Sequence, residues 1–100
     1  MRARVLEIWG FVDTGFDGYL AIPTSLAQEL GPEDYVARWE FADGSLVEAA
    51  EYVGRIEFVG LATPLAARVT AMGEEFLIGR GLIDRFRLTF ERGRRLLLEE

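Results

Sequence analysis

Short runs in which apolar and polar residues alternate dominate this chain, and they predict a mostly β protein. The longest run begins at Leu46 and has the period of two that is typical of a strand. One face of it consists of Ala50, Tyr52, Gly54, Ile56 and Phe58, and the other of Glu51, Val53, Arg55 and Glu57. Gly54 favours a β-bulge in this strand. Further strands are predicted over residues 5–12, with a kink at Gly10, and over 19–22, 35–41, 65–72 and 76–78.

Two glycine-containing dipeptides predict hairpins. Asp43-Gly44 lies between the strand that ends at residue 41 and the one that begins at Leu46, and Asp-Gly is a strong hairpin signal. Arg92-Gly93 predicts a second hairpin, between strands over 87–91 and 94–99. The expected inward side chains of this hairpin are Leu88, Phe90, Leu96 and Leu98. Turns are expected at residues 60–64 and 73–75.

Helical signals are few and short. Ser25 is a suitable N-cap with Gln28 as its capping-box partner, and Gly31 follows the expected helix over 26–30. Residues 81–86 can form one or two further helical turns. The sum of six to eight short strands and two short helices predicts an all-β sandwich or barrel-like fold, with residues 1–100 as a single domain.

The charge and the apolar runs exclude several partners. The chain has 100 residues with 11 cationic and 17 acidic side chains, a net charge of −6. A nucleic-acid binder needs a basic surface, and so does a protein that docks on an anionic membrane, so neither partner is expected. No apolar stretch is long enough to span a bilayer, and the first ten residues lack the apolar core of a signal peptide. A cytoplasmic location is therefore the expectation.

The residue types that are missing restrict the possible chemistry. The chain contains no Cys, no His and no Lys. Disulfides, thiolate metal sites, Ser-His-Asp and Cys-His mechanisms and Schiff bases are therefore excluded. Glu74-Glu75 has no third ligand nearby and is interpreted as a solvated turn, so no metal or other cofactor is expected. Any catalysis must use carboxylates, arginines, hydroxyls and the backbone.

The segment FVDTGFDG carries the best candidate for such chemistry. Asp13 directly follows an apolar strand, which would place its carboxylate at the floor of a cleft. Gly15 lets the backbone turn back tightly, so that amide groups can approach the carboxylate. Thr14 between them can hydrogen-bond locally or across an interface. Taken alone, an Asp-Thr-Gly tripeptide is also what an ordinary loop could contain.

FVDTGFDG and the later FLIGRGLI together resemble the two halves of the signature of retropepsin-like aspartic proteases, a family that includes the retroviral proteases and small prokaryotic ones. The resemblance implies a closed, barrel-like β fold in which the strand Leu77-Ile78-Gly79 crosses the Asp13 loop and a short helix follows. It places the Asp43-Gly44 hairpin where the family has its flap.

The resemblance also implies roles for individual residues. The catalytic residues are Asp13, Thr14 and Gly15. The family is dimeric, and the resemblance implies that Thr14 of each copy hydrogen-bonds to the other copy. Substrate-binding positions are Phe16, Asp17, Gly18, Asp43, Gly44, Ser45 and Ile78. Leu77, Gly79 and Arg80 support the site. The family pairs the residues that match Asp17 and Arg80, so these two side chains are expected within salt-bridge distance of each other and partly buried, although both could instead be ordinary surface charges.

A pair of carboxylates can perform acid–base catalysis in a chain that has no Cys, His or Lys. Two carboxylates at close range share one proton, so one can activate water while the other polarises the scissile carbonyl. The chain has one Asp-Thr-Gly, so the second Asp13 must come from a second copy across a twofold axis. The leading hypothesis is a homodimeric aspartic endopeptidase that hydrolyses polypeptides without a cofactor.

Two alternatives remain at this stage. A dimeric module of the same fold could hold extended peptides by strand addition without turnover. The motifs could also occur by chance in an unrelated β domain. Trp9 and Trp39 are interpreted as core or interface aromatics in each case.

Overall fold

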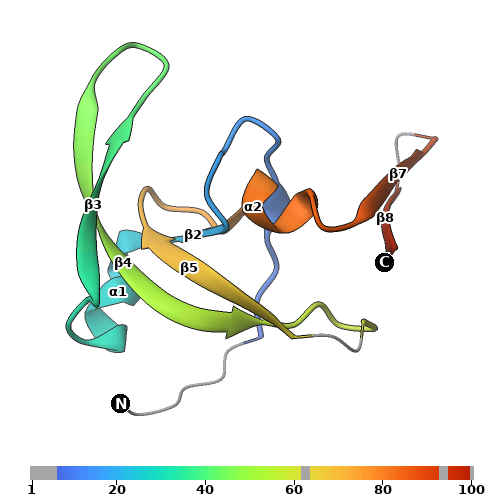
Figure 1. The fold of residues 1–100 in the computed structure, drawn as a ribbon, viewed down its shortest axis with the longest axis horizontal. Coiled ribbons are helices and arrows are strands. Elements are labelled where there is room, and N and C mark those ends of the chain that lie inside the picture. The colour runs from blue at the N-terminus through green and yellow to red at the C-terminus, as the bar shows by residue number, and fades with distance from the viewer. Residues whose placement is uncertain (1–6, 62–63, 93–94, 100) are drawn as a thin grey trace.

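The computed structural model describes residues 7–61, 64–92 and 95–99 (Figure 1). This part of the chain is mostly β, as predicted, with eight strands and two helices. The strands are β1 Phe11–Val12, β2 Leu20–Ile22, β3 Tyr35–Glu40, β4 Leu46–Ile56, β5 Leu65–Ala71, β6 Leu77–Ile78, β7 Arg87–Glu91 and β8 Arg95–Glu99. The helices are α1 Thr24–Leu30 and α2 Arg80–Ile83. At seven and four residues, these described helices are too short to cross a bilayer.

Six of the strands form one sheet in the order β1-β6-β2-β5-β4-β3. The late strand β6 lies between β1 and β2, parallel to β1 and antiparallel to β2. The sheet is open, with β1 and β3 as its edges, whereas a closed, barrel-like sheet was predicted. The edges do not meet because β3 pairs only with β4, in a hairpin that rises away from the other strands (Figure 1).

The predicted hairpin at Asp43-Gly44 is confirmed. Phe41 donates its N–H to the Ser45 carbonyl, and the Gly44 N–H donates to the Phe41 carbonyl, each at 2.9 Å. Gly44 has a φ of +86°, a left-handed conformation that glycine adopts without a steric penalty. The hairpin therefore closes through a turn followed by a left-handed glycine, and this turn projects the tip beyond the sheet.

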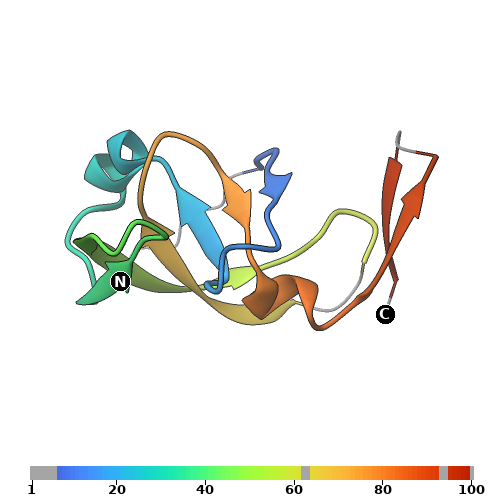
Figure 2. The same ribbon diagram turned by 90° about the horizontal axis from the view of Figure 1, so that it is seen from above.

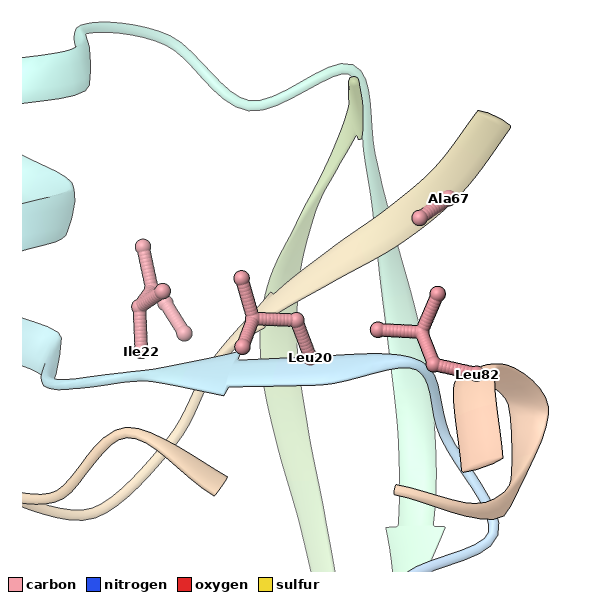
Figure 3. Close-up of a cluster of buried hydrophobic side chains, with 5 residues drawn as sticks. Leu20, Ile22, Ala67 and Leu82 are labelled. Atoms are coloured by element: carbon pink, nitrogen blue, oxygen red, sulfur yellow. The ribbon is translucent and has the colours of Figure 1, made fainter. Parts of the chain in front are cut away.

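The apolar core lies on one side of the sheet, between β2, β5 and α2. Its most buried members are Leu20, Ile22, Ala67, Ala71 and Leu82. Figure 3 shows Leu82 reaching from α2 to the side chains of β2. Three apolar residues of α1, Leu26, Ala27 and Leu30, pack against this cluster. Both helices therefore cover the same face of the sheet.

Near the N-terminus the strand is shorter than predicted. The expectation was a strand over 5–12, but only Phe11–Val12 is a strand, and residues 5 and 6 lie outside the described part of the chain. The strand is short because its one partner, β6, is itself two residues long. Trp9 precedes it and is 94% exposed, so it is not a core residue of this chain.

The predicted cap of α1 is wrong. The helix begins at Thr24 with Pro23 as its N-cap, so Ser25 lies inside the first turn and makes no cap. The Gly73 carbonyl instead accepts the Thr24 N–H at 3.1 Å and the Thr24 hydroxyl at 3.4 Å. A tertiary contact thus replaces the capping side chain. Gly31 ends the helix with a φ of +86°, as the sequence predicted.

The predicted bulge at Gly54 is also wrong. Gly54 pairs with Ala67 in a register that runs without interruption from Glu51 to Ile56.

Helix α2 is shorter than the predicted helix over 81–86. Beyond it the chain continues as two turns, which are closed by the N–H groups of Arg85 and Phe86. The Phe86 ring then packs edge-on against Phe58, with ring centroids 5.3 Å apart.

The last two strands form a separate hairpin that stands apart from the main sheet (Figures 1 and 2). Its register pairs Leu88 with Leu98 and Phe90 with Leu96, so the four residues expected on one face do share a face. The expected turn residue Gly93 lies outside the described residues. Phe90 is 72% exposed, so it does not point into a core of this chain as expected. The hairpin stands to one side of the main sheet and does not cover it (Figure 2).

Candidate active site

Asp13 lies at the end of β1, directly beside β6. Phe11 and Val12 pair with Leu77 and Ile78 in parallel register. The Asp13 N–H then donates to the Ile78 carbonyl at 2.9 Å. The predicted neighbourhood of residues 12–14 and 77–79 is therefore confirmed, although paired residues of the two strands are 66 positions apart in the sequence.

The loop after Asp13 directs a backbone amide at its carboxylate. The Gly15 N–H donates to Oδ1 of Asp13 at 2.9 Å, as the sequence predicted. A Cβ at residue 15 would lie 3.3 Å from the same oxygen, so glycine leaves the carboxylate room. The Phe16 N–H donates to the Asp13 carbonyl at 3.2 Å and closes the turn. Asp13 is half-buried and Thr14 is exposed beside it.

Three backbone hydrogen bonds hold the rest of the loop on the start of α2. The N–H groups of Gly79, Arg80 and Gly81 donate to the carbonyls of Tyr19, Phe16 and Gly18 at 2.9, 2.8 and 3.0 Å. A Cβ at Gly79 would overlap the Gly18 carbonyl oxygen and lie 2.8 Å from that of Phe16. Gly79 is therefore a point of close backbone approach between β6 and the loop.

Phe16 is buried and lies between the loop and the β3–β4 hairpin. Its ring centroid is 5.4 Å from that of Trp39 on β3, with the planes tilted by 40°. Gly18 fits against both rings, because a Cβ there would lie 2.5 Å from Phe16 Cζ and 2.9 Å from Trp39 Cη2. The interpretation of Trp39 as a packing aromatic is confirmed.

A groove of about 580 Å³ opens beside Asp13. One wall is the Asp13 loop and the other is the turn end of the β3–β4 hairpin, where β3 ends and the turn begins, and β2 and β6 form the floor. The residues that line it are Asp13, Gly15, Phe16, Ala21, Glu40, Phe41, Ala42, Met72, Gly73, Glu74, Glu75 and Leu77. The hairpin therefore contributes the first residues of its turn to the same groove as Asp13.

Several predicted substrate-binding residues do not line this groove. Asp43, Gly44 and Ser45 form the exposed tip of the hairpin beyond it. Ile78 packs against the core cluster, and Leu77 has the groove position instead. Successive side chains of a strand point to opposite faces, so only one of these two neighbours can face the groove.

Asp17 and Arg80 lie outside the groove, in a hollow of about 340 Å³ beside α2. Oδ1 of Asp17 is 3.6 Å from Nη1 of Arg80, so the predicted pair forms. Gly18 is buried beneath the Phe16 and Trp39 rings.

Hydrogen bonds at the hairpin tip hold Asp43 in its ionised form. Its Oδ1 accepts the Ser45 hydroxyl at 2.6 Å and the Ser45 N–H at 2.9 Å. The hydroxyl first, and then the N–H, stabilises the carboxylate and lowers the pKa of Asp43 from its usual 3.8. The tip is thus a hydrogen-bonded turn that carries a negative charge.

The groove carries more negative charge than the sequence indicated. Its lining includes the carboxylates of Asp13, Glu40, Glu74 and Glu75, and no Arg is among the described residues that line it. Glu74 and Glu75 are exposed, as expected of a solvated turn, but the turn borders the groove. Pairing of β6 with β1 and β2 brings this turn to the Asp13 loop, and no local sequence signal indicated that proximity.

Comparisons of the chain with protein-family models, with curated proteins and with solved structures each found no match. The groove and the residues that form it are therefore the structural features that indicate a function.

Proposed function

We propose that the protein is a homodimeric aspartic endopeptidase in which Asp13 of each copy forms a catalytic dyad. The observation that carries this proposal is the Asp13 loop: a half-buried carboxylate accepts a backbone N–H from Gly15 and opens onto a groove beside a β-hairpin. The resemblance of FVDTGFDG and FLIGRGLI to the retropepsin-like signature supports the same function.

The reaction needs two carboxylates at about 3 Å, of which one is protonated. The ionised carboxylate takes a proton from a water molecule while that water attacks the scissile carbonyl carbon. The protonated carboxyl donates to the carbonyl oxygen, so a tetrahedral gem-diol forms. The dyad then donates its proton to the amide nitrogen, and a carboxylate takes the proton of one gem-diol hydroxyl as the C–N bond breaks. The products are a carboxylic acid and an amine, and the dyad again holds one proton.

One chain supplies one such loop, so the proposed dyad requires a second copy. Exposed apolar side chains on this chain support an interface. Trp9 and Phe11, just before Asp13, are 94% and 67% exposed, and Phe90 on the β7–β8 hairpin is 72% exposed. Adjacent exposed apolar side chains often mark an interaction surface, and Trp9 and Phe11 are only two residues apart, whereas Phe90 offers a second exposed apolar position in the separate β7–β8 sheet.

The groove also favours a class of substrate. An extended polypeptide fits a groove between a hairpin and a sheet, and the four carboxylates of its lining favour segments that carry Lys or Arg. Raising the salt concentration should weaken this preference, because exposed charges are screened within about 10 Å at 0.1 M salt.

A binding module without turnover is the second candidate. It is favoured by the outer side of edge strand β3, where none of the described strands pairs and where an extended peptide could add. The test is incubation with a denatured polypeptide, followed by mass spectrometry of the products. The endopeptidase predicts new internal cleavages that Asp13→Asn abolishes and Asp34→Asn, a change outside the groove, does not. Binding of the polypeptide without cleavage would overturn the proposal and favour the module.

A further inference from the structure

Glu51 is a buried carboxylate that the proposed reaction does not use. It lies on β4 and is 1% exposed. Oε2 accepts the indole N–H of Trp39 and Oε1 accepts the hydroxyl of Thr70, each at 2.9 Å. Burying a carboxylate is costly unless hydrogen bonds compensate, and here each oxygen has a donor. Because the carboxylate can be buried only with these donors in place, Glu51 constrains the positions of the Trp39 and Thr70 side chains.

The strand register shows that the Trp39 contact is not a simple cross-strand pair. Glu51 is opposite Tyr35 on β3, whereas Trp39 is opposite Val47. The two side chains must therefore meet across the level between them, which is occupied by Ala37 and Ala49. Alanines at that level leave room for the indole to reach the carboxylate. The hydrogen bond to a carboxylate then selects one orientation of the Trp39 ring.

That orientation is transmitted to the candidate active site by direct contacts. The Trp39 ring lies against Phe16 and its Cη2 edge lies against Gly18. Phe16 is tied to Asp13 by its own N–H, which donates to the Asp13 carbonyl at 3.2 Å. A continuous path of packed and hydrogen-bonded groups thus connects Glu51 with the loop that carries Asp13.

We propose that Glu51 is a positioning residue, which holds the Trp39 indole against Phe16 and so fixes the Asp13 loop relative to the β3–β4 hairpin. Glu51 does not line the groove and touches no substrate. Its consequence for catalysis rests on the proposed function, but its effect on the loop does not. The two are therefore tested separately.

The structural arm uses NMR spectroscopy of the ¹⁵N-labelled protein. The chain has two tryptophans, and Trp9 is exposed, so the indole N–H of Trp39 gives its own slowly exchanging signal. Glu51→Leu should accelerate hydrogen exchange of this indole at least tenfold and shift the amide signals of Gly15 and Phe16. Glu51→Gln keeps an acceptor for the indole and should restore both. Thr70→Val, which removes the other donor to Glu51, is the matched control and should leave Trp39 protected.

The activity arm measures kcat/KM with a cleavable peptide. Misplacement of a reacting group by about 1 Å can cost up to a hundredfold in rate. Glu51→Leu should lower kcat/KM at least tenfold, mainly through kcat, whereas Glu51→Gln stays within threefold of the wild type. If the wild type cleaves nothing, the proposed function fails and the NMR arm alone decides whether Glu51 positions the loop.

A folded Glu51→Leu variant with unchanged Gly15 and Phe16 signals would overturn the proposal. If that variant does not fold, Trp39→Phe tests instead whether the Glu51–Trp39 contact positions the loop. This change removes the indole N–H and the contact with Gly18 while it retains a ring beside Phe16. Shifted loop signals in Trp39→Phe are expected, and unshifted ones would overturn the proposal equally.

Discussion

Arg80 and Asp17 form an ion pair at 3.6 Å between helix α2 and the Asp13 loop, and their side chains are 54% and 81% exposed. The pair was predicted at this distance, but it was predicted partly buried, and that part is wrong. Arg80 also reaches Asp84 at 3.7 Å. Because both partners of Arg80 are solvated, the loop is held on α2 mainly by the backbone bonds of residues 79–81.

Asp17→Asn should therefore lower the free energy of unfolding by no more than about 1 kcal/mol, the usual range for an exposed pair. Urea denaturation measures this value, and Arg80→Ala should behave similarly although it breaks both ion pairs. A loss of about 3 kcal/mol or more would instead indicate a buried pair left with one partner.

Gly79→Ala should be much more damaging than these charge changes. Its Cβ would overlap backbone oxygens of Gly18 and Phe16, which cannot rotate away as a side chain can. Overpacking of this kind costs about 1–3 kcal/mol, and we expect the upper end. The control is Gly54→Ala, whose Cβ would lie 3.8 Å from Val69, an ordinary contact. Equal melting temperatures of the two variants would contradict the close approach at Gly79.

The hairpin tip should respond to pH through Asp43. Its pKa is lowered, so the ionised form stabilises the tip above the usual value of 3.8, and this contribution is lost as the pH falls through the lowered pKa. Ser45→Ala removes the hydroxyl donor and should raise the pKa of Asp43, as measured by NMR titration of its side-chain carboxyl. Ser25→Ala, on the surface of α1, is the control. An unchanged Asp43 titration in Ser45→Ala would show that the hydroxyl bond does not form in solution.

The local patterns predicted the strands and the Asp13 loop well, because period and turn residues are local signals. The turn at Asp43-Gly44 and the amide of Gly15 on Asp13 follow from the preferences of glycine. Errors arose where tertiary contacts replaced local ones. At the start of α1, the Gly73 carbonyl accepts the hydrogen bonds of Thr24 in place of a cap by Ser25. The length of β1 is limited to two residues because its partner β6 has only two.

Glu51 shows why part of the site could not be predicted. The alternation along β4 placed it on the polar face, yet it is as buried as the core residues. The sheet is covered on both faces at this level, by the core on one side and by Phe16 and Trp39 on the other. Only the pairing of β3, β4 and β5 brings Trp39 and Thr70 to one carboxylate, and the order of strands in a sheet is not a local property of the sequence.

The β7–β8 hairpin should contribute to self-association. Phe90 is 72% exposed on a hairpin that stands apart from the main sheet. Phe90→Asp should raise the dimer dissociation constant at least tenfold in sedimentation equilibrium while the fold is retained in circular dichroism. The matched control is Thr89→Asp, which places the same charge on the opposite face of β7. If both variants dimerise like the wild type, the interface lies elsewhere on the chain.

A dyad shared between two copies predicts that activity depends on assembly. Specific activity should fall on dilution through the dimer dissociation constant. Mixing the wild type with excess Asp13→Asn chains should inhibit it, because a mixed dimer keeps one ionisable carboxylate of the two. Asp34→Asn chains, added as the control, should leave the rate unchanged because their dyads remain intact.

The pH dependence of the same reaction separates a dyad from a single carboxylate. Activity needs one proton on the pair, so kcat/KM should be bell-shaped, with two apparent pKa values that belong to the dyad as a whole. The acidic limb reflects protonation of both carboxyls and the basic limb loss of the shared proton. The chain has no His, Cys or Lys to produce either limb. The measurement is a pH–rate series at several enzyme concentrations. A pH profile with only one limb would contradict a shared dyad. Specific activity that does not change on dilution, in a sample shown to be monomeric, would contradict it as well, because Asp13 would then act without a second Asp13.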